Sequence, residues 1–346
     1  MNKKLFYLIV LVMALSIVMC GCGSSDSESG TEAGSVDTGK TYNFKIAAQE
    51  SEEHNDVKSI MRVAEAIAEQ TDGHVNITVY PSNQLGDYTQ VYDEVMAGTI
   101  DMACITIPTT YDSRLEMLTI PYLTTNYQEA IDNFLAGSEF FNKLTDIQLE
   151  KGVQTLAVYL DGYMGIGATK SINKVMDYND SHSGILMRCP SVDSYIWTAQ
   201  AMNYGTTTIA YADLYSALQT GVCDGWVGGS AYVNYLNFRD VVKYFCDSRY
   251  IMELITVVIN ADAWNSLPEE YQKIISNVFY EESVSVANAR EELDNKAMDD
   301  MAAMGIEIYV PTNEELNAMR NHFQETVWPK YKDALGDELY NLLLSK

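Results

Sequence analysis

The chain has 346 residues, enough for two domains, and its 48 acidic and 22 basic side chains give a formal net charge of -26. So acidic a chain is a poor binder of nucleic acid or anionic lipid, and we expect no nucleic-acid partner. It would bind an anion only where a local cation overcomes the global field, because salt screens distant carboxylates over about 8 Å.

The N-terminus has the pattern of an export signal. Two lysines precede an apolar run over residues 5–19, which is too short to span a bilayer comfortably. The Gly-Cys pair that ends at Cys22 resembles the end of a bacterial lipoprotein signal, and Cys20 is the alternative anchor. We therefore expect a signal peptide over 1–21, a lipid on Cys22 that holds the chain to the outer face of the cytoplasmic membrane, and a flexible, polar tether over 22–40.

The next segment alternates predicted strands with predicted helices. Apolar residues alternate in the strands and recur at helical spacing in the helices. The strands are expected at 42–48, 75–79 and 100–105, and the helices at 55–71 and 88–97. This alternation favours an α/β fold with a largely parallel sheet covered by helices on both faces.

A second α/β segment follows an apolar strand at 152–160. Its strands are expected at 185–188, 206–209 and 222–227, and its helices at 191–202 and around Tyr215. A further apolar strand at 253–260 could lead back to the first lobe.

A long helix is predicted in the last quarter of the chain. Residues 266–269 have the spacing of a capping box with an early proline. A helix from there to about Met304, with Gly305 as its stop, would be roughly 55 Å long at 1.5 Å per residue, enough to bridge two lobes. A break near 283–285 is the alternative, and Thr312 opens a C-terminal helical segment.

The strongest candidate for ligand binding is Arg188. It ends an apolar strand, and Pro190 and Ser191 can begin a helix directly after it. A guanidinium beside a helix N-terminus is a site for a carboxylate. The alternative is that Arg188 only pairs with a neighbouring Asp or Glu.

Four cysteines follow the tether, and none forms a CxxC pair. Cys104, Cys189 and Cys223 lie in apolar segments, which is typical of small buried side chains. A Cys189–Cys223 disulfide is the alternative in an oxidising compartment. The sequence contains no GxSxG, HExxH, Walker A or EF-hand motif, so we predict a protein that is not an enzyme and that needs no metal or cofactor. The alternative is an exported hydrolase with paired carboxylates.

Several short motifs, taken in their order and spacing, resemble the substrate-binding subunits of TRAP (tripartite ATP-independent periplasmic) transporters, of the dicarboxylate-binding-protein type. The likeness covers most of residues 42–330. The matching segments are 71–75, 79–81, 84–86, 98–102, Arg188, 215–219, 222–225 and 264–268.

The resemblance implies a two-lobed, periplasmic-binding-protein-like clam-shell with hinge strands and a long lobe-spanning helix. Lobe I would contain 41–163 and 254–298, and lobe II 164–253 and 299–346. A small carboxylate would bind Arg188 between the lobes of a monomer and pass to TRAP membrane subunits driven by an ion gradient. The alternatives are a ligand sensor for a signalling receptor and, less favoured, the binding protein of an ATP-driven importer.

Two departures from the family pattern make the expected pocket more apolar. Met164 stands where many relatives have a second arginine, and Trp226 follows the Asp-Gly turn where many have a polar run. We therefore expect a monocarboxylate, or a carboxylate with an apolar or aromatic body stacked on Trp226; the alternative is that Trp226 is a core aromatic. The remaining candidate ligand-binding residues lie at strand ends or near the cleft, and they are Tyr163, Gln49, Thr106, Pro190 and Tyr211.

Overall fold

The computed structural model describes residues 39–344, and the chain from Lys40 onward forms one compact unit. The predicted signal peptide, the lipidated Cys22 and nearly all of the tether lie outside the described residues. Within the described range, no helix combines the length and the apolar character needed to cross a bilayer.

The first sheet has the strand order β2-β1-β3-β10-β4. Its strands are β1 (Tyr42–Ala48), β2 (Val75–Tyr80), β3 (Met102–Ile105), β4 (Val153–Tyr163) and β10 (Met252–Asn260). Strand β1 pairs in parallel with β2 and β3, whereas β10 is antiparallel to both β3 and β4. The sheet is therefore mixed rather than largely parallel, because β10 returns to it from the second half of the chain.

Helices cover this sheet, and their ends follow from local chemistry. The first-lobe helices are α1 (Asn55–Gln70), α2 (Tyr88–Ala97), α3 (Tyr127–Phe134), α4 (Glu139–Leu149) and α8 (Ala261–Asn265). Helix α1 begins where the His54 side chain accepts a hydrogen bond from the Asp56 amide, and it buries Val57, Ile60 and Ile67 on one face. Helix α2 ends at Gly98, whose left-handed φ of 75° closes the last turn.

The second sheet has the order β11-β9-β5-β8-β6-β7. Its strands are β5 (Ile166–Ala168), β6 (His182–Cys189), β7 (Tyr204–Thr208), β8 (Gly225–Val227), β9 (Tyr244–Cys246) and β11 (Glu307–Tyr309). The helices nearby in the chain are α5 (Asp193–Ala201), α6 (Leu214–Thr220), α7 (Ala231–Val233) and α10 (Asn313–Thr326). We refer to the two sheets with their helices as the first and second lobes.

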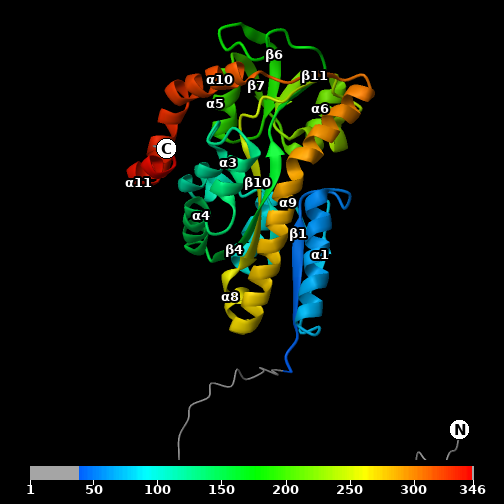
Figure 1. Ribbon diagram of the computed structural model, residues 1–346, viewed down its shortest axis with the longest axis vertical. Coiled ribbons are helices and arrows are strands. Elements are labelled where there is room, and N and C mark those ends of the chain that lie inside the picture. Colours follow the sequence, from blue (N-terminus) through cyan, green and yellow to red (C-terminus); the bar gives the residue numbers. More distant parts are fainter. Residues whose placement is uncertain (1–38, 345–346) are drawn as a thin grey trace, which may run out of the picture. The chain divides into compact units, whose positions relative to one another are not determined.

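Three connections join the lobes. The chain passes from β4 to β5, returns from β9 to β10, and crosses again along α9 (Glu269–Ala303), the long helix that runs through Figure 1. Helix α9 packs against α1 and β4 of the first lobe and α7 and β11 of the second. Its 35 residues would extend roughly 50 Å. It is unbroken and is followed by Gly305 at φ 87°, as the sequence predicts.

The predicted capping box at 266–269 is wrong. Helix α8 ends at Ser266, whose hydroxyl donates to the Ala263 carbonyl, and the residue before α9 is Pro268, which offers no side-chain cap. Ser266 therefore caps the end of the short α8 helix and not the start of α9. Sequence periodicity did not indicate α8. The capping box that begins at Thr312 is confirmed.

The C-terminal segment contacts both lobes. Helix α10 packs on α5, whereas α11 (Lys332–Leu344) packs on η2 (Ser113–Thr119) of the first lobe. The hydroxyl of Tyr331 donates to the Thr119 carbonyl at 2.7 Å. The predicted placement of 299–346 entirely within the second lobe does not match these contacts.

All four cysteines of the described range are buried and free, including Cys189 and Cys223, so the alternative of a disulfide between them is not realised. Their burial confirms the interpretation as small apolar side chains. His182 is also buried, and its Nδ1 lies 2.9 Å from the Met202 carbonyl oxygen.

Candidate ligand-binding site

A cavity of about 80 Å³ lies where strand ends of the two lobes meet. Strands β1 and β3 contribute from the first lobe and β6 and β8 from the second. The cavity wall includes all but one of the residues predicted from the sequence, namely Arg188, Trp226, Met164, Gln49, Thr106, Pro190 and Tyr211. Residues up to 177 positions apart in the sequence, from 49 to 226, are thereby brought to one place.

Arg188 is held by the strand that carries it. It pairs in register with Trp226 of β8 and Thr207 of β7, and its Nε donates to the Ile209 carbonyl at 2.8 Å. The residue is 5% exposed, and burial lowers the pKa of its guanidinium from the ordinary value. Within the described range no carboxylate lies within 4.0 Å of this guanidinium, so its terminal nitrogens remain free for a ligand. The alternative of a structural salt bridge is not realised.

Gln49 and Thr106 form a polar pair at the ends of two neighbouring parallel strands. The Thr106 amide donates to Gln49 Oε1 at 2.8 Å, and Gln49 Nε2 donates to Thr106 Oγ1 at 3.2 Å. These two bonds fix the orientation of the Gln49 amide. The pair therefore presents a rigid polar edge to the cavity.

The opposite wall is apolar and aromatic. Trp226 is 2% exposed and donates from Nε1 to Asn234 Oδ1 at 3.0 Å, while its ring packs on Phe238. Trp226 is thus a core aromatic that also lines the cavity, and the stacking of a ligand on it stays a prediction. Met164 and Tyr211 extend this wall, and the Tyr211 ring centre lies 6.0 Å from Arg188 Cζ.

Tyr163 is the predicted residue that lies outside the cavity wall. It is 1% exposed, and its hydroxyl bonds to Thr124 Oγ1 and the Asn126 carbonyl, both at 2.9 Å. It pairs with Met252 where β4 and β10 leave the first sheet. Its hydroxyl therefore joins the end of β4 to the 124–126 segment.

Carboxyl groups also line the cavity, and sequence patterns gave them little weight. Glu50, which follows β1 directly, is 8% exposed, and burial raises its pKa to about 7. Glu253 faces the same space, and burial raises its pKa well above the ordinary value. An acidic residue in a long apolar strand was the signal that could have identified Glu253.

Two tyrosines that were not predicted from the sequence also line the cavity. Tyr88 comes from α2 and Tyr195 from α5. Tyr195 lies seven positions after Arg188, in the first turn of the helix that Pro190 and Ser191 precede. With 24 tyrosines in the chain, composition offered no means to select these two.

A buried charge cluster adjoins the cavity at the interlobe connection. Arg290 of α9 lies 2.9 Å from Asp56 and 2.8 Å from Asp161, and it donates from Nε to the Leu160 carbonyl. His54 lies 3.5 Å from Asp161. Arg290 supplies the positive charge among these acids. Because Asp161 lies on β4 and Asp56 on α1, the cluster joins the long helix α9 to both elements.

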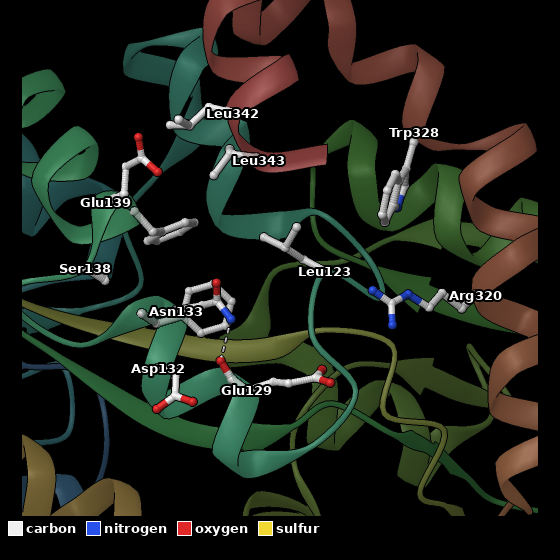
Figure 2. A pocket seen from close by; sticks show the side chains of 12 residues that line it. Leu123, Glu129, Asp132, Asn133, Ser138, Glu139, Arg320, Trp328, Leu342 and Leu343 are labelled. Carbon is white, nitrogen blue, oxygen red and sulfur yellow. Dashed lines mark hydrogen bonds between the residues drawn. The ribbon is translucent and has the colours of Figure 1, made fainter. Parts of the chain in front are cut away.

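A larger cavity of about 250 Å³ lies elsewhere, between α3 and α4 and the C-terminal helices (Figure 2). Arg320 reaches its rim from α10 and Glu129 from α3, while Leu342 and Leu343 of α11 form an apolar side (Figure 2). None of the strand-end residues described above lines it. Its walls come from surface helices, so it lacks the two-lobe construction of the Arg188 cavity.

Known proteins share this fold and sequence pattern. The family model for bacterial extracellular solute-binding proteins, family 7, matches residues 46–333. A monocarboxylate 2-oxoacid-binding periplasmic protein of Nostoc sp. is 26% identical over 80% of this chain and 76% of its own length. The sialic acid-binding periplasmic protein SiaP of Vibrio cholerae is 22% identical over 87% of this chain and 90% of its own.

Among solved structures, a TRAP periplasmic solute-binding protein from Desulfovibrio salexigens with bound orotic acid has the same fold. It superposes with a TM-score of 0.79 at 24% identity and covers 88% of this chain and 99% of that one. The two-lobed α/β architecture with its lobe-spanning helix is therefore confirmed.

Proposed function

This chain belongs to the bacterial extracellular solute-binding proteins of family 7, and on that premise we propose that it captures a small organic acid between its lobes and delivers it to a TRAP transporter. The observation that carries this proposal is the buried, unpaired guanidinium of Arg188 on the wall of an interlobe cavity. A carboxylate is the group that a guanidinium binds in bidentate fashion. Orotate, sialic acid and 2-oxoacids, named for the relatives above, are all carboxylates.

Binding would act by shifting a population. Arg188 and Trp226 lie on the second lobe, and Gln49 and Thr106 on the first. A ligand that contacts both sets stabilises the closed arrangement over the open one by its differential affinity. No proton transfer or covalent step is required, in keeping with a binding protein rather than an enzyme.

We also propose that the protein is anchored by a lipid and that its partners are the TRAP membrane subunits. A lipid on Cys22 would hold a monomer on the outer face of the cytoplasmic membrane, where the TRAP membrane subunits can accept the ligand. Export and the periplasmic location follow from the family, while the lipid rests on the Gly-Cys pattern of the N-terminus. Metabolic labelling with a radioactive fatty acid, compared between the native chain, Cys22→Ala and Cys20→Ala, tests which cysteine carries it.

The decisive experiment is calorimetry on Arg188→Ala. First, native mass spectrometry of the purified protein identifies a ligand carried from the expression host, and a thermal-shift screen of aromatic, branched and keto acids extends the set. The substitution should weaken binding of these acids by about 2–5 kcal/mol, because it leaves a desolvated carboxylate unpaired. Unchanged affinity would remove Arg188 from the mechanism and with it this proposal.

A further inference from the structure

The charges around the cavity are not balanced within the protein. Arg188 contributes one positive charge from the second lobe, whereas the first lobe contributes the carboxyl groups of Glu50, Asp161 and Glu253, and that of Asp87, which is exposed to solvent where it caps α2. Arg290 compensates the hinge acids, because it lies 2.8 Å from Asp161 and is shared with Asp56. No Lys or Arg of residues 39–344 lies within 4.0 Å of the carboxylate of Glu50 or Glu253.

The two uncompensated acids are positioned by the backbone rather than left at a surface. Glu50 follows β1, and its carbonyl accepts from the Ser82 amide at 2.7 Å, which fixes the loop. Glu253 lies in β10 at an irregularity of the ladder, since Met252 pairs with Tyr163 but Leu254 pairs with Leu160. Such irregularities redirect a side chain out of the ordinary alternation.

Proximity among these acids makes each one harder to ionise. Burial is the first cause of the raised pKa of Glu50, to about 7, and the neighbouring Asp161 adds to it. Burial also raises the pKa of Glu253, and both Asp161 and Glu50 add to that rise. Arg188 lies on the other lobe, and the fields of Arg188 and Glu253 both act on Tyr88 and Tyr195, which line the same cavity. The cavity therefore has its positive charge on the wall from the second lobe and these acids on the wall from the first.

We propose that the ligand is a zwitterion, an organic acid that also carries an ammonium group, with its carboxylate on Arg188 and its ammonium between Glu50 and Glu253. This rests on the proposed function, to which it adds the second recognition element. An ammonium supplies three donors and the positive charge that lets these acids ionise in a buried site, whereas a ligand hydroxyl would donate one hydrogen bond and bring no charge. Because Arg188 lies on one lobe and Glu50 and Glu253 on the other, one zwitterion contacts both lobes and favours their closed arrangement.

A panel of matched acids tests the inference by calorimetry. The panel contains the protein amino acids and straight-chain ω-amino acids, each compared with the acid of the same carbon skeleton that carries a hydroxyl or a hydrogen in place of the amine. At least one amino acid should bind, and its hydroxy and amine-free counterparts should bind at least tenfold more weakly. The inference is overturned if no amino acid binds, or if a hydroxy or amine-free acid matches its amino counterpart.

Two variants distinguish a failure of the zwitterion inference from a failure of the proposed carboxylate binding by Arg188. Glu253→Gln should weaken the best amino acid at least tenfold and leave the amine-free acid unchanged or tighter, while Arg188→Ala should weaken both. If Arg188→Ala binds every acid normally, the carboxylate function itself fails. If Arg188→Ala weakens the acids but Glu253→Gln changes none, only the zwitterion is wrong.

Proton release provides a second readout that a purely structural role for these acids would not give. An ammonium placed between Glu50 and Glu253 lowers their pKa, so protons should leave as it binds. The binding enthalpy at about pH 6.5 should then vary with the ionisation enthalpy of the buffer, with net release for the amino acid and none for its amine-free counterpart. Net uptake on binding the amino acid would overturn the assignment of these two acids.

Discussion

The Nη2 atom of Arg290 lies 2.8 Å from Oδ1 of Asp161, and this buried pair joins the middle of the long helix α9 to the strand that leaves the first sheet. Asp161 also borders the ligand cavity. Asp161 therefore lies both at the connection between the lobes and on the wall of the cavity, so we expect this pair to affect both stability and ligand binding.

Arg290→Met should destabilise the fold strongly. The substitution leaves Asp56 and Asp161 buried without their cation, which typically costs about 3–5 kcal/mol. Adding Asp161→Asn to Arg290→Met should restore part of the loss, because it removes one of the stranded charges. Urea unfolding measures each free energy. Lys296→Met on the same helix is the control, since its pair with Asp300 is exposed and should contribute little.

Four buried carboxyl groups should make the ligand-free protein more stable at mildly acidic pH than at neutral pH. Burial raises the pKa of Asp56 and Asp161 to about 6, and that of Glu50 and Asp294 to about 7. Between about pH 4 and 7 the folded state therefore binds more protons than the unfolded state, and the free energy of unfolding falls as pH rises. His54, whose pKa burial lowers to about 4, acts in the opposite sense but is one group against four.

Urea unfolding across this pH range at fixed ionic strength checks the sign. Glu50→Gln should flatten the fall, because it removes one of the groups responsible. Glu52→Gln removes the same charge at an exposed neighbouring position and should leave the slope nearly unchanged. A free energy that climbs steadily from acid to neutral pH would contradict the argument.

Gly162→Ala should cost far more than Gly152→Ala. Gly162 has φ 90°, and a Cβ there would overlap the Asp294 carboxylate and come within 2.6 Å of Ser230 Cβ. Gly152 has φ 75° but open space around it, so Gly152→Ala carries only the backbone strain of about 1–2 kcal/mol. Overpacking should add about 1–3 kcal/mol at Gly162. Equal losses in thermal or urea unfolding would show that the hinge can relax around the methyl group.

Tyr163→Phe should reduce stability without changing ligand affinity. The hydroxyl bonds to Thr124 and Asn126 within the first lobe and does not line the cavity, so the change loses about 1 kcal/mol of hydrogen bonding. Calorimetry beside Arg188→Ala gives the contrast, with affinity retained in one variant and lost in the other. A loss of affinity in Tyr163→Phe would show that this hydroxyl contributes to ligand binding.

Local patterns were sufficient for much of the architecture. The strand at 42–48, the helices that begin at Asn55 and Tyr88, and the unbroken α9 all follow from apolar periodicity and glycine stops, which act over a few residues. The placement of Arg188, Gln49 and Thr106 at one cavity also followed, because each residue directly precedes or follows the end of a strand and such ends gather in α/β folds.

Only the tertiary structure decided the charges of the site. The acidity of Glu50 and Glu253, the pairing of Arg290 with Asp56 and Asp161, and the separation of Tyr163 from the cavity depend on contacts between segments distant in the sequence. Periodicity shows which face of an element is buried, but not which charges the fold places opposite one another. Burial strengthens electrostatic interactions several-fold, so these long-range neighbours determine what the cavity can hold.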